Sequence, residues 1–166
     1  MSKFHFSAKS ILLISVIFLL VSSCSKDDTV NPAYVGTWSI TTTESGVQVK
    51  DNMTFTKDGF TDIAQMYYPT TNKWIDIIKT TGTISVTGST MTITYTGIGV
   101  LTDLTGSITM STTGSSDFQR IMSENGIPLT FSSQFSVAGK KLTIMTDMNN
   151  NGNYTDPGET IVYTKQ

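Results

Sequence analysis

The chain has 166 residues, a formal net charge of −2 and 14% charged residues, with a single cysteine and a single histidine. This length corresponds to about one domain, and the charge excludes the basic surface that neutralises nucleic-acid phosphates. We therefore expect no nucleic-acid partner.

The chain begins with a basic and then apolar leader. Lys3 and Lys9 precede an apolar run over residues 11–21. This run is shorter than the roughly 20 apolar residues that a bilayer-spanning helix needs. A basic segment, a short apolar segment and small residues before a cleavage point are typical of a secretory signal. We predict that residues 1–23 are a signal peptide.

The lone cysteine lies at the end of this leader. The run Val21-Ser22-Ser23-Cys24 resembles the lipobox of bacterial lipoproteins. The resemblance implies that Cys24 is acylated and that residues 24–33 form a lipidated N-terminus with a polar tether. Each buried acyl methylene contributes about 0.8 kcal/mol, so several chains hold a soluble domain at a membrane. The open alternatives are an ordinary signal peptide with a stray cysteine and an uncleaved anchor.

The residues after the cysteine suggest where the protein is displayed. Ser25-Lys26-Asp27-Asp28 resembles the Lys-acidic-acidic tag that follows the lipid cysteine in surface-exposed lipoproteins of Bacteroidota. The resemblance implies attachment to the outer membrane and exposure at the cell surface.

Cleavage after Ser23 would also remove two charged residues and the one histidine from the chain. The loss of Lys3 and Lys9 changes the net charge from −2 to −4, and His5 leaves with them. Without histidine, neither a Ser-His-Asp nor a Cys-His arrangement can form, and a zinc, copper or haem site built on His or Cys is excluded. Paired carboxylates remain available for glycoside chemistry. The acidic residues are scattered along the sequence, however, and we expect no acid pair and no enzyme.

Threonine-rich alternation dominates the rest of the chain and predicts β-strands with one buried face. The apolar members of these runs are Trp38 and Ile40, Met53 and Phe55, Ile84 and Val86, Met91, Ile93 and Tyr95, Ile108 and Met110, Leu129, Phe131, Phe135 and Val137, Leu142 and Ile144, and Ile161 and Tyr163. Short Gly-containing links at residues 57–59, 87–89 and 138–140 favour antiparallel hairpins. We predict an all-β domain over residues 34–166, an antiparallel up-and-down barrel of about eight strands; a β-sandwich is the alternative.

One stretch departs from this alternation. Ser116 and Gln119 have the spacing of a capping box, and Phe118, Ile121 and Met122 share one helical face. Asn125-Gly126 and Pro128 then stop the helix. We expect a short helix near residues 117–124 that plugs one end of the barrel or forms a lid over a pocket.

The first strand carries a family resemblance. Gly36-Thr37-Trp38, followed by residues 53–59 and 82–88, resembles the lipocalin-like domains of Bacteroidota lipoproteins. The resemblance implies a barrel that holds a small hydrophobic ligand, although a barrel of eight strands can also be filled by its own side chains. Lipocalins place a basic residue over this tryptophan, and only Lys165 is available for that role here. The residues expected to line the pocket or the core are Trp38, Phe55, Tyr95, Phe131 and Phe135.

A polar stretch near the C-terminus has the pattern of a calcium loop. Oxygen-bearing side chains recur at alternate positions with a glycine at the sixth, as calcium requires, although Glu159 falls one residue beyond the EF-hand position. The alternative is an Asn-rich turn, which needs no cation. The candidate ligands of a structural Ca²⁺ are Asp147, Asn149, Asn151, Asn153, Asp156 and Glu159.

A second functional class uses the outside of the domain. Tyr67, Tyr68, Trp74 and Tyr154 are expected in or near loops, where aromatic rings can stack on sugars or on a protein partner. The alternative to a ligand-binding barrel is therefore a surface interaction or glycan-binding module with a filled core. Half-buried packing explains the same aromatic residues without a partner.

Overall fold

The computed structural model describes residues 32–101, 107–149 and 151–166, and within them Pro32–Gln166 forms one compact unit. Cys24 and the predicted signal peptide lie outside the described residues. The described residues form nine strands and one helix: β1 (Gly36–Glu44), β2 (Val47–Phe55), β3 (Gly59–Tyr68), β4 (Lys73–Thr87), β5 (Thr90–Leu101), β6 (Ile108–Thr112), α2 (Ser116–Glu124), β7 (Thr130–Ala138), β8 (Lys141–Met145) and β9 (Thr160–Lys165). No helix among these residues is long and apolar enough to cross a membrane.

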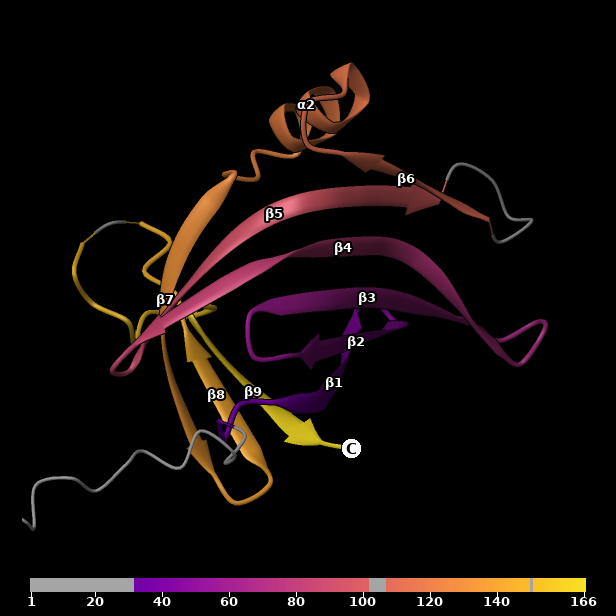
Figure 1. The fold of residues 1–166 in the computed structure, drawn as a ribbon. Helices are drawn as coiled ribbons and strands as arrows, with labels where there is room; N and C mark the ends of the chain where they lie inside the picture. Colours follow the sequence, from indigo (N-terminus) through magenta and orange to yellow (C-terminus); the bar gives the residue numbers. More distant parts are fainter. Residues whose placement is uncertain (1–31, 102–106, 150) are drawn as a thin grey trace, which may run out of the picture. The chain divides into compact units, whose positions relative to one another are not determined.

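Eight of the strands close into an antiparallel barrel, which confirms the predicted fold and shows that the sandwich alternative is wrong. The sheet order is β4-β3-β2-β1-β9-β8-β7-β5-β6, and β4 also pairs with β5. That additional pairing closes the circle and leaves β6 as an extra strand beside the far half of β5 (Figure 1). Since successive antiparallel strands alternate in direction, the turns fall at two ends. We call them the Trp38 end, which includes the start of β1 and the β2–β3, β4–β5 and β7–β8 turns, and the Asp147 end, which includes the β1–β2 and β3–β4 turns and the β8–β9 loop.

The Trp38 end is closed by a packed aromatic core. Trp38 is fully buried, and its indole nitrogen donates to the Tyr34 carbonyl oxygen at 2.7 Å. The edge of the Tyr34 ring meets Phe55, with the ring centroids 6.2 Å apart. Lys165, directly opposite Trp38 in the β1–β9 register, holds its ammonium 5.1 Å from the centre of the indole. The strand pairing thus brings Lys165 to the place that the sequence resemblance assigns to a basic residue.

The helix α2 packs against β5 and β6 (Figure 1). Its buried residues Phe118 and Met122 pack on Ile98 of β5, with Tyr95 and Ile127 at the border of the cluster. The cap is Ser115, one residue before the predicted cap, because its side-chain oxygen accepts the Phe118 amide at 3.1 Å. The helix is therefore confirmed, and it rests on β5 and on the extra strand β6.

A glycine in β4 lets two rings meet across the strand. Gly82 lies between Phe60 on β3 and Tyr95 on β5, and the two ring centroids are 5.6 Å apart. A β-carbon at Gly82 would lie 2.2 Å from the Thr94 carbonyl oxygen and 2.5 Å from the Phe60 ring. Only glycine fits this contact.

Candidate functional site

A groove of about 810 Å³ lies near the Asp147 end of the barrel. It lies between the α2–β7 connection on one side and the loop that joins β8 to β9 on the other. Its apolar surface comes from Tyr95, Ile127, Pro128, Phe131 and Met148. The volume is within the range of small-molecule sites, which are mostly apolar with a few placed polar groups.

The groove exists because β7 is longer than its partner β8. The β7–β8 register ends at the pair Gln134 and Met145, and a 2.6 Å contact between the Ser133 and Thr146 hydroxyls follows it. The first residues of β7 therefore have β5 on one edge and the groove on the other. Leu129 and Phe135 direct their backbone groups toward β5, so the alternate residues Thr130 and Ser132 direct theirs toward the groove.

Two of the five predicted pocket residues line this groove. Tyr95 and Phe131 are half-buried neighbours whose ring centroids are 5.8 Å apart. Trp38 and Phe55 are instead completely enclosed in the core at the Trp38 end. Phe135 packs against Tyr34 and lines a separate cleft of about 450 Å³ at that same end.

Inside the barrel, the structure brings together an acid pair, contrary to the expectation from the sequence. Asp51 on β2 and Asp62 on β3 lie on the inner face, near enough for their carboxyl groups to share a hydrogen bond. The Tyr163 hydroxyl donates to Oδ2 of Asp51 at 2.8 Å. The expectation that the acids are scattered is wrong at these two positions, because pairing of β2 with β3 makes diagonal neighbours of residues that are eleven apart in sequence.

The environment of this pair strongly perturbs its acidity. Burial, followed by the neighbouring Asp51, raises the pKa of Asp62 to about 9, so Asp62 carries a proton at neutral pH. Burial also raises the pKa of Tyr95 to about 12, with further contributions from the charges of Asp62 and Asp51. Burial and Asp51 raise the pKa of Tyr163 as well. Tyr95 lines the groove and also packs on Phe60, which lies two residues before Asp62 on the inner face of β3.

The sequence contained a signal for the acid pair. Period-two alternation places Asp51 on the same face as Met53 and Phe55, and Asp62 on the same face as Phe60. An acidic residue in register with core aromatics is unusual, because an unpaired buried carboxylate is costly.

The candidate calcium loop is ordered by its own hydrogen bonds. Oδ1 and Oδ2 of Asp147 accept the backbone amides of Asn151 and Gly152 at 3.1 and 2.8 Å. The side-chain nitrogens of Asn149, Asn151 and Asn153 all donate to Asp156, at 2.9, 2.7 and 2.8 Å. These contacts, the first two above all, lower the pKa of Asp156.

Glu159 closes the same loop from inside the protein. It is only 3% exposed, its Oε1 accepts the Met148 amide at 3.0 Å, and its Oε2 is buried without a hydrogen-bond partner. No group of three or more His, Cys, Asp or Glu side chains within metal-binding reach occurs in the described part of the chain. A cation here would therefore depend on Asn side-chain oxygens and backbone carbonyls, which calcium accepts.

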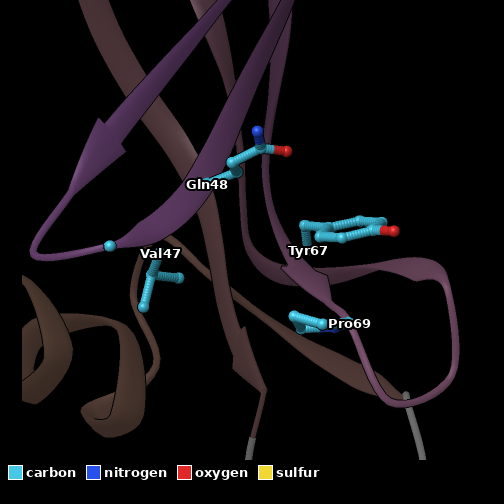
Figure 2. A pocket seen from close by; sticks show the side chains of 5 residues that line it. Val47, Gln48, Tyr67 and Pro69 are labelled. Carbon is cyan, nitrogen blue, oxygen red and sulfur yellow. The ribbon is translucent and has the colours of Figure 1, made fainter.

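Three of the four predicted surface aromatics lie at two places. Tyr67 at the end of β3 stands opposite Trp74 on β4, with ring centroids 5.4 Å apart, and the Tyr67 hydroxyl donates to Asn72. Figure 2 shows Tyr67 and Pro69 beside Gln48 and Val47 of β2, where they line a pocket of about 270 Å³. Tyr154 belongs to the large groove.

Comparisons with known proteins do not add a relative: no protein-family model matches the sequence, and no curated protein shows significant similarity to it.

Proposed function

We propose that this protein is a lipid-anchored envelope protein of the lipocalin-like kind, whose barrel binds a small, largely apolar ligand in the groove near the Asp147 end. The observation that carries the proposal is the groove itself, which reaches from the surface to the interior rings of Tyr95 and Phe131. Aromatic walls supply the apolar contact, and the strand edge at Thr130 and Ser132 supplies polar groups that orient a ligand. No catalytic role is needed for this function.

A neutral fluorescent probe tests the binding function. N-phenyl-1-naphthylamine should bind the purified protein saturably, and Phe131→Ala should weaken that binding at least tenfold. Leu129→Ala is the matched control, because Leu129 is a neighbouring apolar residue with 49% of its surface exposed and does not line the groove. Equal binding by both variants and the parent protein would overturn the proposal.

The lipid anchor has a separate test. The lipobox-like sequence before Cys24 supports the proposal that acyl chains fix the protein to the outer membrane. Cys24→Ala should move the protein from the membrane fraction to the soluble fraction and remove the mass of the acyl groups. Membrane retention equal to that of the parent would contradict the anchor and leave the groove unaffected.

A structural calcium ion is a second candidate function, held by the loop from Asp147 to Glu159. The buried, unpartnered Oε2 of Glu159 favours it, because an uncompensated buried carboxylate oxygen needs a donor or a cation. Calorimetric titration with calcium tests this assignment directly, and the absence of binding heat would remove it.

Sugar recognition at the outside of the barrel is the alternative to ligand binding in the groove. Tyr67 and Trp74 form a half-buried pair next to the pocket in Figure 2. Aromatic pairs of this kind can stack on sugar rings, and a glycan array comparing the parent with Trp74→Ala tests the idea. Loss of a specific glycan signal in the variant would support it.

A further inference from the structure

Apart from the hydrogen bond that the Asp51 and Asp62 carboxyl groups can share, three buried oxygens in the barrel interior have no partner among the described residues: Asp51 Oδ1, Asp62 Oδ1 and Thr80 Oγ1. They come from the consecutive strands β2, β3 and β4. Asp62 and Thr80 are directly opposite in the β3–β4 register, and Thr80 is only 6% exposed. The register therefore places these three polar side chains next to one another, as one patch, on the inner wall.

The chemistry of this patch favours a cationic hydrogen-bond donor. Buried acceptors are costly unless a donor reaches them. A primary ammonium group offers three N–H donors and a positive charge, and it matches a patch of three oxygens of which two belong to carboxyl groups. The ring of Tyr95 is close enough to the pair for both aspartates to affect its pKa, and aromatic faces attract cations.

The strand register places this patch close to the inner end of the groove. Tyr95 lines the groove and stands opposite Gly82, which is two residues from Thr80 on β4, so a ligand between Tyr95 and Phe131 would have its inner end near the patch. Asp147 is the one charged residue among those that line the groove in the described part of the chain. Its negative charge also favours the entry of a cation.

We propose that Asp51, Asp62 and Thr80 form the subsite for the ammonium group of a primary amine, whose aromatic or apolar tail lies in the groove beside Tyr95 and Phe131. This assignment rests on the proposed binding function and names its ligand class. The ammonium takes the place of the proton on Asp62: the amine enters as R–NH₃⁺, one proton leaves to solvent, and no covalent bond of the ligand changes. The titratable groups that face Asp62 are Asp51, Tyr95 and Tyr163.

The test compares three ligands of similar shape with the purified protein by calorimetry. The probes are 2-phenylethylamine, its neutral isostere 2-phenylethanol and the anion phenylacetate. The amine should bind at least tenfold more tightly than the alcohol, and the anion most weakly. Amine affinity should rise from pH 6 to pH 8. The binding heat should differ between phosphate and Tris buffers by the amount expected for release of about one proton.

Two variants separate this assignment from general binding. Asp62→Asn should reduce amine affinity at least tenfold and abolish the pH dependence, while the alcohol binds within about twofold of the parent. The variant should fold, because Asp62 is already uncharged at neutral pH. Asp58→Asn is the control, since Asp58 is an exposed aspartate in the β2–β3 turn. Equal affinities for amine and alcohol would overturn the ammonium subsite and leave the binding groove standing. Binding of none of the three ligands would overturn both.

Discussion

The hydroxyl of Tyr163 donates to Oδ2 of Asp51 at 2.8 Å across a sequence separation of 112 residues. The bond joins the last strand, β9, to β2, two strands that do not pair in the sheet. It is made inside the barrel, where a hydrogen bond is electrostatically stronger than in water. The interior of this barrel is therefore held by polar contacts as well as by apolar packing.

Removal of that hydroxyl should weaken the fold. Tyr163→Phe leaves Oδ2 of Asp51 buried without its donor, and we expect a loss of about 1–3 kcal/mol in the free energy of unfolding. Urea denaturation followed by tryptophan fluorescence measures it. Tyr67→Phe is the control, because its hydroxyl bond to Asn72 is exposed and should matter by less than about 0.5 kcal/mol. Equal losses in the two variants would show that the Asp51 contact has no special role.

Stability should depend on pH through Asp62. Its pKa is about 9 in the folded protein, against an ordinary value of about 3.9 when unfolded. Between these values the folded state binds the additional proton, so the free energy of unfolding should fall as the pH rises from about 4 to about 9. The slope from this group reaches at most about 1.4 kcal/mol per pH unit.

The variant Asp62→Asn isolates that contribution. Urea denaturation at pH 5, 7 and 9 should show that the free energy of unfolding of the variant increases relative to that of the parent protein as the pH rises. Asp58→Asn should follow the parent at every pH, since this side chain is exposed. A constant difference between Asp62→Asn and the parent would mean that Asp62 titrates normally.

The absence of a side chain at Gly82 should be essential for the contact between Phe60 and Tyr95 across β4. In Gly82→Ala the new β-carbon would collide with the Thr94 carbonyl oxygen and with the Phe60 ring. We expect a loss of about 1–3 kcal/mol or more, measured by thermal and urea denaturation. Ser85→Ala, at an exposed position of the same strand, should stay within about 0.5 kcal/mol of the parent. Unchanged stability in Gly82→Ala would show that the Phe60–Tyr95 contact is loose.

Calcium should stabilise the protein through Glu159. If the loop binds the ion, calcium at ten times its Kd adds about 1.4 kcal/mol to the free energy of unfolding, and EDTA removes this gain. Glu159→Gln should abolish the calcium-dependent change in melting temperature. Glu124→Gln, on the exposed face of α2, should keep it. Melting curves that are the same in calcium and in EDTA would count against the ion.

Alternation predicted most of the strands because their inner residues are apolar. Trp38, Phe55 and Ile93 are core residues as expected, and the short Gly-containing turns indicated antiparallel neighbours correctly. Strand β3 and the first half of β4 were not anticipated. Their inner positions include Asp62 and Thr80, so the apolar period is interrupted there.

The candidate site was harder to predict than the fold for a physical reason. The groove results from where β8 stops relative to β7, and strand register is a property of the closed barrel that no local pattern encodes. Tyr95 and Phe131 were anticipated as inner aromatics, whereas the pairing of Asp51 with Asp62 depends on the neighbouring strand. Leu129 was expected to face inward with Phe131, but it precedes β7 and is 49% exposed.

The most direct test of the central claim is a titration of the ¹⁵N-labelled protein with 2-phenylethanol, followed by backbone amide chemical shifts. The binding groove predicts saturable shifts concentrated at Tyr95, Phe131, Ser132 and Met148, all of which line it. Tyr67 and Trp74, on the outside of β3 and β4, should change little. Shifts that do not saturate, or that are largest at Tyr67 and Trp74, would contradict a ligand site in this groove.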